Sequence, residues 1–194
     1  MLSTGVRSPV AVKLFGAINS LAQLVLKATS PGVPDFYQGT ELWDLSLVDP
    51  DNRRPVDYAL REKYLGELLN DAEADGPKSV AKNLLLNLSD GRAKLWTMQR
   101  VLDLRNRLGP AFLESAYSPI ALKESDHAVA YLRGNNVLTV LPRFARSLAG
   151  GDATLPLGEM WGKRELPLTG CAVRWRNIFS GETVEAENGS LRLA

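Results

Sequence analysis

Two residue types that build many functional sites are scarce in this chain of 194 residues, which has a single cysteine, Cys171, and a single histidine, His127. One cysteine cannot form an intramolecular disulfide, so the sequence predicts a reducing compartment and a cytoplasmic location. Structural zinc sites need four Cys or His ligands, and we expect no metal and no cofactor. A serine or cysteine triad would have to use His127 as its base, which disfavours nucleophilic catalysis of that kind.

The chain also lacks an excess of either charge, because 23 basic and 22 acidic side chains give a formal net charge of +1. Without a basic patch, nucleic acid is not an expected partner. The longest apolar stretch, residues 21–28, is interrupted by Gln23 and Lys27 and is much shorter than the ~20 residues that a transmembrane helix needs. No membrane partner is expected, and residues 1–10 show no secretory signal. A neutral ligand fits this composition best.

The first half of the sequence has mainly helical periodicity. Apolar residues recur at helical spacing in residues 12–29 and again in residues 57–70, where Asp57 can cap the helix. A Pro-Gly pair ends the first helix, and residues 33–38 then read as a short strand closed by glycine. Two further helices are predicted over 78–88 and 92–108.

After Pro110 the pattern changes from helical to alternating. Alternation predicts strands, and a tight turn at residues 134–136 joins two of them. The predicted strands cover residues 118–123, 128–133, 137–141 and 172–177. The second half is therefore expected to be an antiparallel β domain.

The segment 40–56 is polar and, at ~17 residues, longer than a connection normally needs, which indicates function. Tyr37 and Trp43 can stack on pyranose rings, and several polar side chains can bond sugar hydroxyls. These polar residues are Asp49, Asp51, Asn52, Arg53 and Arg54. In the alternative interpretation, the two arginines pair with the two aspartates and only make the loop rigid.

Two stretches of this segment carry a family resemblance. Residues 31–42 read PGVPDFYQGTEL, which resembles the eighth-strand signature of the α-amylase superfamily, glycoside hydrolase family 13. The longer strings at residues 38–44 and 49–57 read QGTELWD and DPDNRRPVD, and they resemble the maltooligosyl trehalose synthases. The first signature is shared by many amylase relatives, whereas the joined strings are specific.

The resemblance implies an intramolecular transglucosylation in trehalose biosynthesis, which turns the reducing-end α-1,4 bond of a maltooligosaccharide into an α,α-1,1 bond. Retaining chemistry of this kind uses two carboxylates about 5 Å apart. In the family these carboxylates belong to barrel strands that precede the strand signature, so no catalytic residue is carried over and the chain alone is expected to be inactive. The substrate-binding residues that the resemblance implies are Tyr37, Gln38, Glu41, Arg53 and Arg54.

The implied fold is of the α+β class and has three parts. Residues 1–75 would be the last helix and strand portion of a (β/α)8 barrel with flanking helices, 76–110 a helical connector, and 111–194 a C-terminal antiparallel β domain. The expected partners are a maltooligosaccharide substrate and the missing N-terminal barrel portion. Two alternatives stay open: a non-catalytic carbohydrate-binding or regulatory module, and a remnant that needs a partner chain to complete the barrel.

Overall fold

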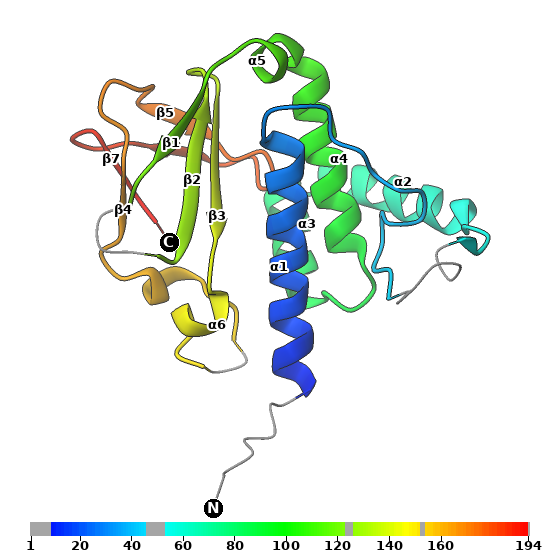
Figure 1. Ribbon diagram of the computed structural model, residues 1–194. Coiled ribbons are helices and arrows are strands. Elements are labelled where there is room, and N and C mark those ends of the chain that lie inside the picture. The colour runs from blue at the N-terminus through cyan, green and yellow to red at the C-terminus, as the bar shows by residue number, and fades with distance from the viewer. Residues whose placement is uncertain (1–8, 46–52, 123–125, 152–153, 194) are drawn as a thin grey trace, which may run out of the picture. The chain divides into compact units, whose positions relative to one another are not determined.

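The computed structural model describes residues 9–45, 53–122, 126–151 and 154–193 of the chain (Figure 1). It mixes helices and strands, as expected. The chain forms two compact units. The sheet unit comprises residues 1–31, 110–175 and 185–194, and the helical unit comprises residues 32–109 and 176–184.

A three-stranded antiparallel sheet is the centre of the sheet unit. Its strands are β1 (Tyr117–Ile120), β2 (Ala128–Arg133) and β3 (Val137–Pro142), in the order β1-β2-β3. The register pairs Ala130 with both Ile120 and Val140. Side chains of β3 alternate between buried and half-buried, which is the period of a strand covered on one face. The predicted strands at 128–133 and 137–141 and the turn at 134–136 are confirmed, whereas the strand predicted over 118–123 is observed over Tyr117–Ile120.

Smaller elements complete the sheet unit. They are α5 (Gly109–Leu113), α6 (Ala145–Leu148), the 3-10 helix η2 (Gly158–Trp161), and the strands β4 (Glu165–Pro167), β5 (Arg174–Arg176), β6 (Thr183–Glu185) and β7 (Ser190–Arg192). β4 pairs with β7, and β5 pairs with β6. Trp161, Leu166 and Leu168 form a buried cluster with side chains of β2. The segment between β5 and β6 belongs to the helical unit.

Helix α1 (Pro9–Thr29) belongs to the sheet unit and packs beside β3 (Figure 1). Phe15 and Ile18 are buried against Ala145 and Ala149. At the other end of the helix, the hydroxyl groups of Thr29 and Tyr131 are 2.6 Å apart. This grouping differs from the expected one, which placed α1 with residues 32–75. None of the helices in the described part of the chain combines the length and apolar character needed to cross a bilayer.

Three helices form the helical unit: α2 (Tyr58–Ala74), α3 (Pro77–Leu86) and α4 (Arg92–Arg107). Asp57 caps α2 as predicted, because its Oδ1 accepts a hydrogen bond of 2.9 Å from the Leu60 amide. The core brings the three helices together with one residue of the polar segment, Leu42. Its buried members are Leu42, Leu68, Val80, Leu84, Ala93, Leu95 and Trp96.

The strand predicted at 33–38 is not formed in this chain, because residues 33–37 have no regular structure and residue 38 begins a turn. A strand is stabilised by hydrogen bonds to a neighbouring strand. No strand in the described residues pairs with this segment. Pro34 also has no N–H to donate.

Candidate functional site

The candidate site is built on a tight turn at residues 37–40. The Tyr37 carbonyl accepts hydrogen bonds from the Thr40 amide at 3.1 Å and from the Thr40 hydroxyl at 2.6 Å. Gly39 has a φ of 88°, in the left-handed region. A Cβ at this position would also lie 3.1 Å from Cγ2 of Val56. The turn therefore needs glycine at position 39, as the sequence has it.

Arg61 of α2 anchors this turn to the helix through hydrogen bonds. Its Nε donates to Oε2 of Glu41 at 2.7 Å, and its Nη2 donates to the Gly39 carbonyl at 2.6 Å. The third contact runs from Nη1 to the Asp57 carbonyl at 3.0 Å. Glu41, predicted to bind substrate, thus forms an ion pair with Arg61 inside the chain. Sequence reasoning missed Arg61, although its position four residues after the helix cap Asp57 places both on one helix face.

Two of the predicted substrate-binding residues are exposed on the turn. The Tyr37 side chain is 47% exposed, and Gln38 is exposed as well. Oε1 of Gln38 accepts a hydrogen bond of 3.2 Å from the Tyr58 hydroxyl. The turn therefore exposes an aromatic ring and an amide at consecutive positions, and hydrogen bonds hold its backbone.

The residues that follow the turn are anchored to the helical core. Leu42 is buried, and the indole N–H of Trp43 donates to the Leu88 carbonyl at 2.6 Å. Nζ of Lys94 donates to the Leu42 carbonyl at 3.2 Å and lies 5.9 Å from the centre of the Trp43 ring. Trp43, expected to stack on sugars, is half-buried and serves as an anchor of the loop.

Gly91 makes the close approach of this anchor possible. Its φ is 83°, and a Cβ built there would lie 2.9 Å from the Trp43 amide nitrogen. A distance this short is sterically forbidden, so the contact between the loop and the start of α4 requires glycine. In the sequence alone, Gly91 reads only as a turn residue before α4.

Arg53 and Arg54 are exposed, and Pro55 and Val56 separate them from Asp57, the cap of α2. Asp49, Asp51 and Asn52 lie outside the described residues. The two readings of the arginines, as ligands of sugar hydroxyls or as ion-pair partners of the aspartates, therefore both stay predictions.

Two pKa shifts of the helical unit have structural causes away from the turn. Burial lowers the pKa of Arg100, whose Nε donates to the Ile178 carbonyl at 2.8 Å. The hydrogen bond from Lys78 lowers the pKa of the Glu182 carboxyl. Because Trp96 also donates to the Phe179 carbonyl, at 3.2 Å, these contacts fix the segment between β5 and β6 on the helical unit.

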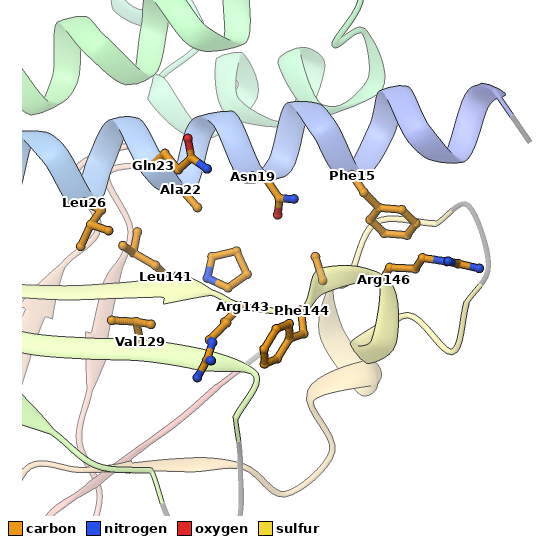
Figure 2. Close-up of a pocket in the computed structure, with 12 residues that line it drawn as sticks. Phe15, Asn19, Ala22, Gln23, Leu26, Val129, Leu141, Arg143, Phe144 and Arg146 are labelled. Carbon is orange, nitrogen blue, oxygen red and sulfur yellow. The ribbon is translucent and has the colours of Figure 1, made fainter. Parts of the chain in front are cut away.

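The sheet unit contains a separate cavity of about 360 Å³ between α1 and the strands β2 and β3 (Figure 2). Asn19 reaches toward it from α1, and Phe144 borders it from the segment after β3. Phe144 has a φ of 53°, and its ring centre lies 4.3 Å from the guanidinium carbon of Arg143. None of the predicted substrate-binding residues lines this cavity.

Comparison with known proteins finds longer relatives, although no family model matches the chain. It is 37% identical over 165 residues to the putative maltooligosyl trehalose synthase of Mycobacterium tuberculosis strain H37Rv, which covers 78% of this chain and 19% of the relative. The maltooligosyltrehalose synthase of Arthrobacter ramosus matches in structure with a TM-score of 0.69 and 30% identity, over 93% of this chain and 21% of that one. A hypothetical maltooligosyl trehalose synthase of Sulfolobus tokodaii matches with a TM-score of 0.64 and 28% identity, over 94% and 20%.

These matches define the class of the chain: it is homologous to one part of a much larger synthase, and it spans about a fifth of that length. The particular relatives are maltooligosyl trehalose synthases, and the resemblance to their C-terminal part that the motifs carry is confirmed.

Proposed function

We propose that this chain supplies the C-terminal part of a maltooligosyl trehalose synthase and carries one rim of its glucan-binding cleft. The observation that supports the proposal is the 37% identity over 165 residues to the mycobacterial synthase. The whole enzyme would convert the reducing-end α-1,4 bond of a maltooligosaccharide into an α,α-1,1 bond, as part of trehalose biosynthesis. In that enzyme, residues of this chain would bind the maltooligosaccharide and would not take part in breaking or forming its bonds.

The turn at 37–40 provides the groups for this role. The exposed ring of Tyr37 offers an apolar face for a pyranose ring, and the amide of Gln38 can both donate to and accept from sugar hydroxyls. The guanidinium groups of Arg53 and Arg54 would add donors at the cleft rim. Glu41 has a different task, because its contact with Arg61 makes it a support of the turn.

The fold of the whole enzyme is part of the same proposal. Residues 33–38 would form the last strand of a (β/α)8 barrel once earlier strands are present, since an extended segment becomes a strand by pairing with its neighbours. Active sites of such barrels lie at the carboxyl ends of the strands. Tyr37 and Gln38 would then occupy the position where barrel enzymes hold their substrates.

The catalytic carboxylates would come from outside this chain. Retaining transfer between sugars needs a nucleophile and an acid about 5 Å apart. Glu41 alone cannot supply both groups, and its Oε2 already accepts from Arg61 at 2.7 Å. We therefore expect the isolated chain to convert no maltooligosaccharide.

A chimeric enzyme tests this proposal. The chain replaces the homologous segment of the mycobacterial synthase, and the loss of reducing ends from maltopentaose is measured. We expect synthase activity from the chimera and none from the isolated chain. A Tyr37→Ala chimera should have a raised KM, because an aromatic contact is lost, and a Tyr117→Ala chimera serves as a control at a half-exposed tyrosine of the sheet unit.

Two outcomes would contradict the proposal. A chimera that folds with the thermal stability of the parent enzyme but turns over no substrate would show that this chain does not serve as that segment. Tight binding of maltooligosaccharides by the isolated chain, measured by calorimetry, would instead favour a carbohydrate-binding module.

A further inference from the structure

We propose that Arg61 is a positioning residue of the glucan-binding turn: it holds Tyr37 and Gln38 in place for substrate without touching substrate itself. This inference rests on the proposed function. It names a residue that lies outside the family motif strings, on helix α2, and it assigns Glu41 to the same support.

The three hydrogen bonds of Arg61 support this role. Its guanidinium joins the first turn of α2, through the Asp57 carbonyl, to two points of the loop, the Gly39 carbonyl and the Glu41 carboxylate. The planar guanidinium fixes the directions of all three bonds at once, which the single ammonium of a lysine does not do. The side chain is 17% exposed and that of Glu41 26%, so water competes weakly for these bonds.

The contact with the Gly39 carbonyl matters most for the geometry of the turn. Glycine adopts positive and negative φ about equally well, so the peptide that follows Gly39 has no strong preference of its own. The bond of 2.6 Å from Nη2 selects one orientation of this carbonyl. The N–H of the same peptide belongs to Thr40 and donates to the Tyr37 carbonyl at 3.1 Å, so the orientation of this peptide is coupled to the backbone of Tyr37 and Gln38.

The ion pair between Lys63 and Glu67 within α2 is an example of an ordinary surface contact. Lys63 and Glu67 approach to 3.9 Å with side chains 68% and 43% exposed, one helical turn apart. Such pairs contribute little and fix nothing beyond their own helix. The pair of Arg61 and Glu41 joins residues 20 positions apart and is shorter by more than 1 Å.

The effect on kinetics separates positioning from plain stability. If Arg61 only stabilises the fold, its loss lowers the amount of active enzyme, and the KM of the remaining molecules stays the same. If Arg61 positions Tyr37 and Gln38, its loss weakens substrate binding, and KM rises while kcat per active molecule changes little.

The chimera with the mycobacterial synthase provides the first measurement. We expect Arg61→Met to raise the KM for maltopentaose about tenfold, with kcat per folded enzyme within about twofold. Arg61→Lys should recover part of the loss, since it keeps the charge but not the planar group. Lys63→Met on the same helix is the matched control and should leave KM unchanged. An unchanged KM for Arg61→Met in an active chimera would overturn the inference.

Hydrogen exchange on the chain itself provides the second measurement, and it does not depend on activity. Arg61→Met should speed the exchange of the Thr40 amide and leave the amides of α4 unchanged. An inactive parent chimera would count against the proposed function and not against Arg61, whereas unchanged exchange at Thr40 would overturn the positioning role whatever the chimera does.

Discussion

A buried arginine in the sheet unit offers the sharpest test of the structure. Arg133 ends strand β2 and is 2% exposed. Its Nη2 donates to the Phe112 carbonyl at 2.6 Å and to the Ser115 carbonyl at 3.3 Å, and its Nη1 donates to the Thr29 carbonyl at 3.4 Å. Thr29 is the last residue of α1, so the cation lies at a helix end where carbonyl groups carry partial negative charge.

The expected cost of Arg133→Met follows from these contacts. A hydrogen bond to a charged group contributes about 1.5–3 kcal/mol, and only the contact with Phe112 is short enough for that range. The two longer contacts add about 0.5 kcal/mol each, since hydrogen bonds weaken with length. Methionine fills a similar volume and removes the cost of burying a charge, which offsets part of the loss. We expect a net loss of about 2–3 kcal/mol in the free energy of unfolding.

Urea unfolding followed by circular dichroism measures this change. Arg143→Met is the matched control, because it makes the same replacement in the same unit at an exposed arginine that lies over the Phe144 ring. The control should lose less than about 1 kcal/mol, as exposed cation–π contacts do. If Arg133→Met loses no more than Arg143→Met, the carbonyl contacts contribute nothing net and the reasoning fails.

Two further predictions concern the helical unit. Gly91→Ala should lower the free energy of unfolding by more than about 1 kcal/mol, because alanine is strained at a φ of 83° and its Cβ would lie 2.9 Å from the Trp43 amide. Gly66→Ala in α2 is the control, because a Cβ there meets nothing within 4 Å. It should leave the free energy of unfolding unchanged or raise it by up to about 1 kcal/mol. Equal losses of unfolding free energy in the two variants would contradict the close approach at Gly91. Lys78→Met should raise the pKa of Glu182, since the bond from Lys78 lowers that pKa in the folded chain, and NMR titration of the carboxyl carbon measures it. A Glu182 pKa that stays low in the variant would show that another group causes the shift. Because the folded pKa lies below the ordinary one, the stabilisation by Glu182 is present above its ordinary pKa and is lost as pH falls through the folded value.

Local features of the sequence determined much of the secondary structure and the family. Helix α4 was predicted over 92–108 and observed over Arg92–Arg107, because its apolar residues recur at helical spacing. The cap at Asp57 and the turn at 134–136 depend on residues a few positions apart. The strings at 38–44 and 49–57 carried the resemblance to the synthases, and they needed no knowledge of the fold.

Only the tertiary structure decided the features that depend on distant partners. Residues 33–38 have the composition of a strand but no regular structure over 33–37, because a strand exists through hydrogen bonds to a neighbour. Arg133 reads as an ordinary strand residue, and its burial depends on helix ends about 20 and about 100 positions away. The role of Arg61 likewise appears only when the loop lies against α2. Periodicity and capping are set by neighbouring residues, whereas the burial of a charge and the pairing of a strand are set by the groups that folding brings to them.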